Sequence, residues 1–508
     1  MGMVREMAAL MRAGYVLARE GVISALPGDA LPPPARIGHR LAGWIARRQV
    51  KDRAQSERLS RALNRLGPSW VKLGQFLATR PDVVGKEIAR DLELLHDQID
   101  PFPLAAAKQS VSASLGRPVE EMFDEISEPV AAASVAQVHR ARIASSGDEV
   151  ALKVIRPGVR RRFERDLSTF YFAARLQERF IEAAKRLRPV AVVDMLAQSA
   201  HMEMDLRLEA AALSEMAENT QDDPGFRVPG VDWELTGRDC LTIHWIDGIK
   251  LNDVAALQKA GHDIDLIAAN LVQSFLRHTL RDGFFHADMH PGNLFVEPDG
   301  TIAAVDLGIT GRLGKKERRF LAEILYGFIR RDYQRVAEVH FEAGYVPSDR
   351  DVTEFARALR AVGEPIFGMD ASKMSMGGIL SYLFEVTERF GMETRTELIL
   401  LQRTMVVVEG VARSLNPQIN IWQVARPVVE NYIRKNVGPR AALRDLSRTL
   451  AVLSRYGPRL PQIVESALVR QSQQPHPPPR PSRLVYAAWA IAGFAAGAAT
   501  VIATVELL

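Results

Sequence analysis

The sequence contains almost no cysteine, and its positive and negative charges nearly balance. Among 508 residues there is one cysteine, Cys240, which excludes an internal disulfide and a zinc site built from several cysteines. The formal net charge is +4, and no basic stripe with interleaved aromatic residues occurs. We therefore expect a protein of a reducing compartment that has no nucleic-acid partner. Hydrophobic residues make up 47% of the chain and charged residues 25%, as in a folded protein with two or three packed units.

The N-terminal stretch has no unbroken apolar run. Charged side chains interrupt it at Arg5, Glu6, Arg12, Arg19 and Glu20, which excludes the apolar region of a signal peptide. The acidic residues also argue against a mitochondrial presequence. The pattern predicts an amphipathic helix, and two interpretations stay open: the helix packs on its own protein, or it lies on a membrane surface.

The C-terminus has the opposite character. The 22 residues from 484 to 505 carry no charge, and as a helix they would span about 33 Å, enough to cross a bilayer core. Arg480 and Arg483 precede the stretch, so we predict a single-pass helix in a bacterial-type inner membrane, with the large N-terminal part cytoplasmic. Gly493 and Gly497 form a GxxxG pair that would permit a homodimer. The alternative is a buried, alanine-rich core helix.

Periodicity and turn residues divide the chain into five parts. We predict an N-terminal helical extension over 1–105, a lobe with a small sheet over 106–250, a helical lobe over 251–470, a Pro-rich linker over 471–483 and a transmembrane anchor over 484–508. Strands are expected in three stretches, at 130–154, 241–246 and 293–308. In the helical lobe we expect breaks near Pro347, Pro365 and Pro417. This order predicts an α+β fold in two lobes.

The strongest chemical signal is a pair of motifs in the second half of the chain. Asp288 precedes Asn293 by five positions, and Asp306 opens an Asp-Leu-Gly triplet thirteen residues later. A protein-kinase catalytic loop carries a base Asp and a metal-binding Asn at this spacing, and its Asp-Phe-Gly motif adds a second carboxylate. Asn293 and Asp306 supply the hard oxygen atoms that Mg²⁺ prefers, and Asp288 is the candidate base. A rival interpretation takes His286, Asp288 and His290 as metal ligands of a hydrolase.

A second signal lies upstream, in a Val-Ala-Leu-Lys tetrapeptide that ends at Lys153. It resembles the strand motif whose lysine holds the α- and β-phosphates of ATP in kinases. Such a lysine needs an acidic partner on a helix, and Glu203, Asp205 and Glu209 are candidates. Asp205 and Glu209 are four residues apart and therefore share a helix face.

Two further motifs depart from those of ordinary protein kinases. Where kinases have a glycine-rich nucleotide loop, this chain has Ala131, Ala132, Ala133 and Ser134. An alanine backbone prefers helical or extended geometry, so Ser134 and Gln137 could contact phosphate in place of glycine amides.

The other departure is a pair of short polar motifs, Lys72-Leu-Gly-Gln75 and Glu203-Met-Asp205. Gly67-Pro68 predicts the start of a helix, and on that helix Lys72 and Gln75 lie opposite the apolar side. A solvated polar face would explain them equally well from the residues alone.

Jointly these motifs resemble the UbiB family of atypical kinase-like proteins, whose members support ubiquinone biosynthesis. The resemblance runs from about Arg40 to Glu430. It implies a two-lobed protein-kinase-like fold with an N-terminal helical extension and a C-terminal transmembrane helix. It also implies ATP or ADP and Mg²⁺ as cofactors. The alanine-rich loop and the strand residues Ile243 and Trp245 would then bind the nucleotide.

The resemblance also assigns roles to the remaining polar residues. Lys72, Lys153 and Asp288 would be catalytic, with Glu209 as the partner of Lys153. Lys72 and Gln75 would lie over the cleft where a kinase holds its peptide, and Lys72 would meet Glu203, Asp205 or Asp306.

One absence bears on the substrate. Only six residues, ITGRLG, separate the Asp-Leu-Gly triplet from the charged helix expected at 315–331, so the long activation segment of protein kinases is missing. A protein substrate is therefore not expected. We predict an ATPase or small-molecule kinase at a membrane face, with membrane lipid, quinone intermediates and quinone-biosynthesis proteins as partners. The alternatives are a protein or small-molecule kinase outside quinone metabolism, and a nucleotide-binding scaffold without turnover.

Overall fold

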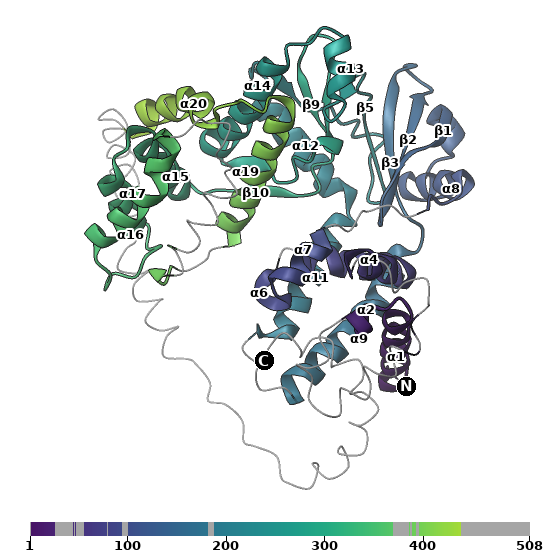
Figure 1. Ribbon diagram of the computed structural model, residues 1–508. Helices are drawn as coiled ribbons and strands as arrows, with labels where there is room; N and C mark the ends of the chain where they lie inside the picture. The colour runs from purple at the N-terminus through teal and green to yellow at the C-terminus, as the bar shows by residue number, and fades with distance from the viewer. Residues whose placement is uncertain are drawn as a thin grey trace, which may run out of the picture. The chain divides into compact units, whose positions relative to one another are not determined.

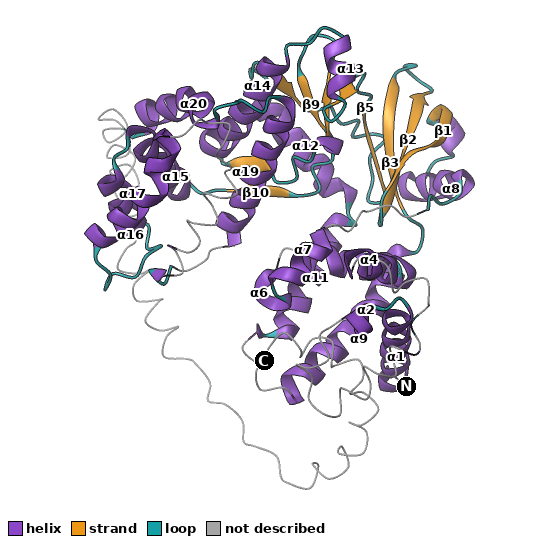
Figure 2. Ribbon diagram, viewed as in Figure 1, coloured by secondary structure: helices purple, strands orange, loops and turns teal. Residues whose placement is uncertain are grey.

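The computed structural model describes most of the chain in two compact units. The described residues are 2–25, 44, 46, 55–78, 80–93, 100–180, 187–368, 386, 389–392 and 396–437. The first unit comprises the described residues up to Leu208 together with Asp232–His244. The second comprises Glu209–Val231 and the described residues from Trp245 onward. Both units combine helices with short strands, which confirms the predicted α+β class (Figures 1 and 2).

Helices make up most of the first unit. They are α1 (Gly2–Arg19), α2 (Val22–Ala25), α4 (Gln55–Leu66), α5 (Pro68–Ala78), α6 (Pro81–Val84), α7 (Lys86–Glu93), α9 (Val159–Phe180) and α11 (Pro189–Glu203). The predicted helix start is confirmed, because α5 begins at Pro68, whose fixed φ suits a first turn. Gly67 before it has φ of 108°, and a Cβ there would meet the Arg162 guanidinium. Trp70 and Phe170 pack edge to face at 4.8 Å and join α5 to α9.

A four-stranded antiparallel sheet follows α8 (Leu104–Leu115) and the short helix η3 (Val119–Glu121). Its order is β1-β2-β3-β5, formed by β1 (Phe123–Ala132), β2 (Ala136–Ile143), β3 (Glu149–Ile155) and β5 (Cys240–His244). The strands expected over 130–154 and 241–246 are thus confirmed. Figure 2 shows the four strands side by side with α8 beside them.

Alternation along β3 decides which way its lysine points. Val150, Leu152 and Val154 are fully buried and pack with Cys240 and the apolar residues of α8. Successive side chains of a strand point to opposite faces, so Lys153 lies on the face away from this core. The sheet therefore presents the lysine without placing its charge among apolar side chains.

Helices dominate the second unit as well. They are α12 (Leu206–Thr220), which begins in the first unit, α13 (Val254–Lys259), α14 (Ile264–Arg277), η4 (His278–Asp282), α15 (Lys315–Arg330), α16 (Tyr333–Glu342), α17 (Val352–Gly368), α19 (Thr396–Leu415) and α20 (Ile421–Asn436). The expected breaks near Pro347 and Pro417 are confirmed, since each lies between two helices. The expected break near Pro365 is wrong, because α17 continues through it. Packing of Phe355, Leu359 and Val362 against Tyr333 outweighs the backbone hydrogen bond that proline removes.

Two small sheets complete the second unit. One has the order β4-β9-β8-β6 and is formed by β4 (Phe226–Arg227), β9 (Ile302–Ala304), β8 (Leu294–Val296) and β6 (Ile249–Lys250). The other pairs β7 (Phe284–His286) with β10 (Thr310–Arg312). The strands expected over 293–308 are confirmed as β8 and β9.

The C-terminal predictions fall on other residues. No helix among the described residues is long and apolar enough to cross a membrane. The Pro-rich linker at 471–483, the predicted anchor at 484–508 and its Gly493/Gly497 pair lie outside the described residues.

Candidate nucleotide and metal site

Two strand pairs bring the motifs of the second unit together. In the β7–β10 pair His286 lies opposite Thr310, and the Ala287 amide donates to the Ile309 carbonyl at 3.0 Å. In the β8–β9 pair Leu294 lies opposite Ala304, and the Val305 amide donates to the Asn293 carbonyl at 2.9 Å. The loop with Asp288 connects β7 to β8, and the turn with Asp306 connects β9 to β10. Because β7 pairs with β10 and β8 pairs with β9, the loop and the turn lie side by side.

Asp288 and Asn293 are joined directly. The Asn293 Nδ2 donates to the Asp288 carboxylate Oδ2 and to the Asp288 carbonyl, both at 3.1 Å. A single 3₁₀ turn, η5 (Pro291–Asn293), brings the two residues together across their five-residue separation. Because the amide nitrogen is used in this way, the amide oxygen is the atom with which Asn293 can bind a cation.

Asp306 has an unusual backbone. Its φ is 60°, one of three positive values among the described non-glycine residues. Asp tolerates this left-handed conformation better than most residues do, because its short side chain can bond to the local backbone. The Gly308 amide faces the Asp306 Oδ1 at 3.4 Å, and Leu307 between them is buried. This turn presents the carboxylate directly after strand β9.

The two histidines of the rival hydrolase interpretation serve the backbone instead. The His286 Nδ1 accepts from the Asp288 amide, and the His290 Nδ1 accepts from the Gly292 amide, both at 3.2 Å. Burial lowers the pKa of His286, whose side chain is almost inaccessible, so its ring is neutral at neutral pH. Among the described residues no group of three or more His, Cys, Asp or Glu side chains could hold a metal ion. The geometry therefore argues against a hydrolase-type cluster.

The catalytic-loop segment has a buried anchor that the sequence did not suggest. The Thr404 hydroxyl on α19 shares its one proton between the Ala287 carbonyl at 3.2 Å and the Leu400 carbonyl at 2.8 Å. Thr404 is fully buried, although it lies far from the motif in the sequence. A lone threonine in a helix gives no sequence signal for such a role.

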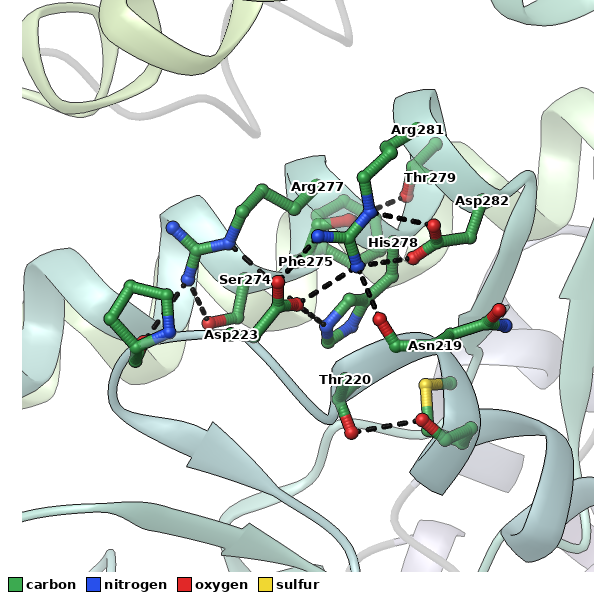
Figure 3. A network of polar contacts seen from close by, with 12 residues as sticks. Asn219, Thr220, Asp223, Ser274, Phe275, Arg277, His278, Thr279, Arg281 and Asp282 are labelled. Atoms are coloured by element: carbon green, nitrogen blue, oxygen red, sulfur yellow. Dashed lines mark hydrogen bonds and ion pairs between the residues drawn. The ribbon is translucent and has the colours of Figure 1, made fainter.

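A second unanticipated feature is the polar network around Asp223 (Figure 3). The Asp223 carboxylate, only 3% exposed, accepts hydrogen bonds at 3.1 Å from His278 Nε2 and from Arg281 Nη2, and Arg277 lies at 3.8 Å. Burial alone would raise the pKa of Asp223, but the hydrogen bonds from His278 and Arg281 outweigh it and lower that pKa well below its ordinary value. The network holds the π-helical turn η4, which leads directly into β7 and the loop of Asp288.

In the first unit the structure places the predicted phosphate-binding residues on the sheet. Lys153 lies on β3, opposite Val138 and Leu241 of its neighbouring strands. Its expected partner Glu209 belongs to the second unit, where it lies in the first turn of α12 and is 8% exposed. Ile243 lies near the end of β5, and Trp245 directly follows that strand.

The loop within the alanine-rich segment is shorter than expected. Ala131 and Ala132 belong to β1 and pair with β2, so their backbone is extended, as predicted for alanine. The turn itself comprises residues 133–135, and Ser134 within it is buried. A 2.8 Å hydrogen bond from the Ala133 amide to the Ala136 carbonyl closes the turn.

The expected phosphate contact of Gln137 is wrong. Its side chain is fully buried, accepts from the Phe102 amide at 2.9 Å and donates to the Phe102 carbonyl at 3.1 Å. Gln137 therefore fixes the chain before α8 and is not available to a ligand. The sequence could not distinguish these roles, because Phe102 lies in a different part of the chain.

The two short polar motifs meet within the first unit. Lys72 on α5 forms an ion pair with Glu203 at the end of α11, and the two side chains are only 15% and 14% exposed. A solvated polar face is therefore the wrong description of Lys72. Gln75 is half-buried one turn along the same helix. Asp205 instead pairs with Arg207 at 2.7 Å, and this hydrogen bond lowers the pKa of Asp205.

The chain is similar to known proteins over most of its length. The model of the ABC1 atypical kinase-like domain matches residues 94–340, and that of the UbiB helical domain matches residues 359–420. The chain is 40% identical to the Probable protein kinase UbiB of Marinobacter nauticus over 91% of this chain and 85% of the relative. It is also 40% identical to the protein of that name from Cronobacter sakazakii, over 89% and 84% of the two chains.

A solved structure supports the same fold. It is a Mycobacterium tuberculosis protein in complex with erythromycin, 25% identical to this chain, with a TM-score of 0.51 over 73% of this chain and 97% of the other. The fold is thus kinase-like, with a mixed α/β content. On the motifs, the fold and the relatives together, the chain belongs to the UbiB family of atypical kinase-like proteins.

Proposed function

We propose that this protein binds ATP or ADP with Mg²⁺ and acts as an ATPase or small-molecule kinase that supports ubiquinone biosynthesis. The observation that carries the proposal is the hydrogen bond between Asn293 and Asp288, with Asp306 presented by the adjoining strand pair. This is the constellation that a phosphoryl-transfer site needs: one base and two oxygen ligands for a metal. The family named in the relatives supports the link to quinone synthesis.

The residues present fit a Mg²⁺ ion. The Asn293 amide oxygen and the Asp306 carboxylate would hold it, and both are hard oxygen ligands. A site with few protein ligands suits a cation that takes its other ligands from phosphates and water. When bound, the ion would neutralise charge on the transferring phosphate.

The chain's own groups would perform the remaining steps. The Asp288 carboxylate would accept the proton of the attacking water or hydroxyl, and Asn293 would hold that carboxylate in position. Lys153 would bind the α- and β-phosphates, with Glu209 as its partner. The neutral His286 ring accepts a hydrogen bond from the Asp288 amide and so helps to hold the loop.

Two features favour hydrolysis or a small acceptor over a protein substrate. After Gly308 the chain enters β10 at Thr310 and α15 at Lys315, so no segment is long enough to dock a peptide there. In addition, the Lys72–Glu203 ion pair fixes the polar motif helix that the family resemblance places over the cleft. A nucleotide-binding scaffold without turnover is the remaining alternative, and a measured ATPase rate separates the two.

Nucleotide binding can be tested by thermal shift. Wild-type protein should be stabilised by Mg-ATP, by about 2.7 kcal/mol at a ligand concentration a hundredfold above Kd. Lys153→Ala and Asp306→Asn should each abolish this stabilisation, because each removes a charge that serves the Mg-phosphate site. Lys259→Ala, an exposed lysine on α13, is the matched control and should respond as wild type does. An unchanged shift in either site variant would mean that the site is misplaced.

Transfer can be tested with radiolabelled ATP. We expect slow hydrolysis by wild type and no phosphorylation of itself or of added proteins. Ala132→Gly, which loosens the end of β1, or Lys72→Ala, which removes the ion pair, should permit some self-phosphorylation. Asp306→Asn is the negative control. Strong phosphorylation of added proteins by wild type would refute the proposal and favour an ordinary protein kinase.

We further propose a single-pass anchor at 484–508 in a bacterial-type inner membrane, with the catalytic lobes cytoplasmic. The uncharged stretch and the two preceding arginines support it. Deleting 484–508 should release the protein from membranes while Mg-ATP still stabilises it. A truncated protein that unfolds would identify the segment as a core helix instead. Quinone profiling of a deletion strain tests the pathway, and crosslinking through Gly493→Cys tests a homodimer.

A further inference from the structure

The N-terminal helix α1 is fixed to the first unit by one of its faces. Ala13 and Ala18 are buried there, and the helix packs against α4 and α9. At its end the fully buried Glu20 carboxylate forms an ion pair with the Arg65 guanidinium at 2.6 Å, and Arg61 lies at 3.8 Å. Figure 1 shows α1 beside α2 and α9. The interpretation that this helix packs on its own protein is therefore confirmed for this face.

The other face of α1 is apolar and exposed. Val4, Met11 and Tyr15 are 75%, 55% and 51% exposed, and Ala8 between them is also exposed. These residues follow the spacing i, i+4, i+7 and i+11, so they form one stripe along the helix. A helix of a soluble protein normally places such a stripe against its core, and here the core-facing positions are occupied by other apolar residues.

The positive charges of α1 lie on one side of this stripe. At 100° per residue, Arg5, Arg12 and Arg19 lie about 50–90° from its centre, all on the same flank. Glu6 lies about 170° away on the opposite side of the helix. Within the part of the chain that the structure describes, no carboxylate pairs with Arg5 or Arg12, and Arg19 donates to the Tyr15 hydroxyl at 3.0 Å. The exposed face thus combines apolar side chains with positive charge and has no acidic residue.

We propose that the exposed stripe of α1, with its flanking arginines, docks on the surface of an anionic lipid bilayer, with the helix axis in the plane of the membrane. Val4, Met11 and Tyr15 would enter the interface, and the arginines would contact lipid phosphates. Charge favours this occupant over a second copy of the chain, since the exposed face carries arginines and has no acidic residue with which a second copy could pair them. This contact is separate from the predicted anchor and does not depend on it.

The test places a fluorescent reporter on the stripe of the full-length chain. Met11→Cys is labelled with the environment-sensitive dye NBD, while the buried Cys240 stays unlabelled in the native protein. Asn64→Cys, at an exposed position of α4 in the same unit, is the matched control. Both proteins are reconstituted into phosphatidylcholine vesicles with and without phosphatidylglycerol. The dye at position 11 should shift to shorter wavelength with phosphatidylglycerol and be quenched by doxyl-labelled lipid, whereas the dye at position 64 should show neither effect.

A charge variant makes the test specific. Arg5→Gln with Arg12→Gln changes only exposed side chains, so the fold should persist, and the shift at position 11 should largely disappear. A shift that is unchanged in this variant, or equal at positions 11 and 64, would overturn the proposal. An emission shift at position 11 that occurs in detergent and grows with protein concentration would also overturn the proposal, because it would indicate that a second copy of the chain binds the stripe. If the segment 484–508 does not anchor the protein, less protein will float with the vesicles. The dye at position 11 should still be quenched and the dye at position 64 should not.

Discussion

Replacing Lys72 with methionine removes the charge but keeps most of the side chain's length. Its partner Glu203 would then be a carboxylate that is only 14% exposed and has lost its cation. Removing one member of a fully buried pair costs about 3–5 kcal/mol, whereas exposed pairs contribute about 0–1 kcal/mol. Because both side chains are mostly but not entirely buried, we expect the variant to lose about 2–3 kcal/mol of stability.

A double-mutant cycle with Glu203→Gln isolates the pair, and we expect a coupling energy of about 2 kcal/mol. Urea unfolding gives the stabilities, and hydrogen exchange of α5 and α11 shows whether the loss is local. The exposed pair Arg426–Glu430 on α20 is the control, since its side chains are 54% and 41% exposed and its coupling should stay below about 0.5 kcal/mol. A coupling between Lys72 and Glu203 as small as that of the control would refute the reasoning.

Three further predictions concern the second unit. Burial lowers the pKa of His340 from 6.5 to about 4, so below pH 6.5 the unfolded chain binds a proton that the native state does not. Stability should therefore fall by about 2 kcal/mol from pH 7 to pH 5 in urea unfolding, and His340→Gln should reduce this slope. Asp223→Asn should cost about 2–4 kcal/mol in the same assay, because it removes a buried carboxylate that pairs with Arg277 and Arg281. In thermal melts Gly311→Ala should cost about 1–3 kcal/mol, since its Cβ would lie 2.1 Å from the Phe285 ring, whereas Gly410→Ala in open space on α19 should be neutral or stabilising.

The parts of the fold that could be predicted are those set by local pattern. Alternating apolar residues at Val150, Leu152 and Val154 fix both the strand β3 and the face on which Lys153 lies. Asp288 and Asn293 are close in sequence, and a single turn suffices to join them. Such features depend on a few neighbouring residues, so the spacing of these residues in the sequence is enough to predict them.

The features that escaped prediction connect distant parts of the chain. Asp223 reaches His278 and Arg281 from another element, and Gln137 binds the backbone at Phe102. Nothing in the local pattern distinguishes such a buried polar residue from an exposed one, because only the tertiary fold supplies its partner. For the same reason α17 runs through Pro365, where core packing overrides a residue that usually ends helices.

The family resemblance supplied what the local pattern could not for Lys72. From the residues alone, a lysine on the polar side of a helix was best explained by solvent. The structure pairs it with Glu203, one of the three carboxylates that the resemblance offered. The prediction that Lys72 meets a carboxylate therefore came from the family motif and not from the physical chemistry of α5 itself.

The left-handed backbone at Asp306 restricts which amino acids evolution can place there. At φ of 60° the residues that fit with little strain are Gly, Asn and Asp. The candidate metal site requires a negatively charged oxygen ligand at this position, which only Asp and Glu supply. Only aspartate belongs to both sets, so any single substitution at this position should lose either the ligand or the conformation. Asn keeps the backbone and removes the charge, whereas Glu keeps the charge and strains the backbone, and the pair of variants would measure the two requirements separately.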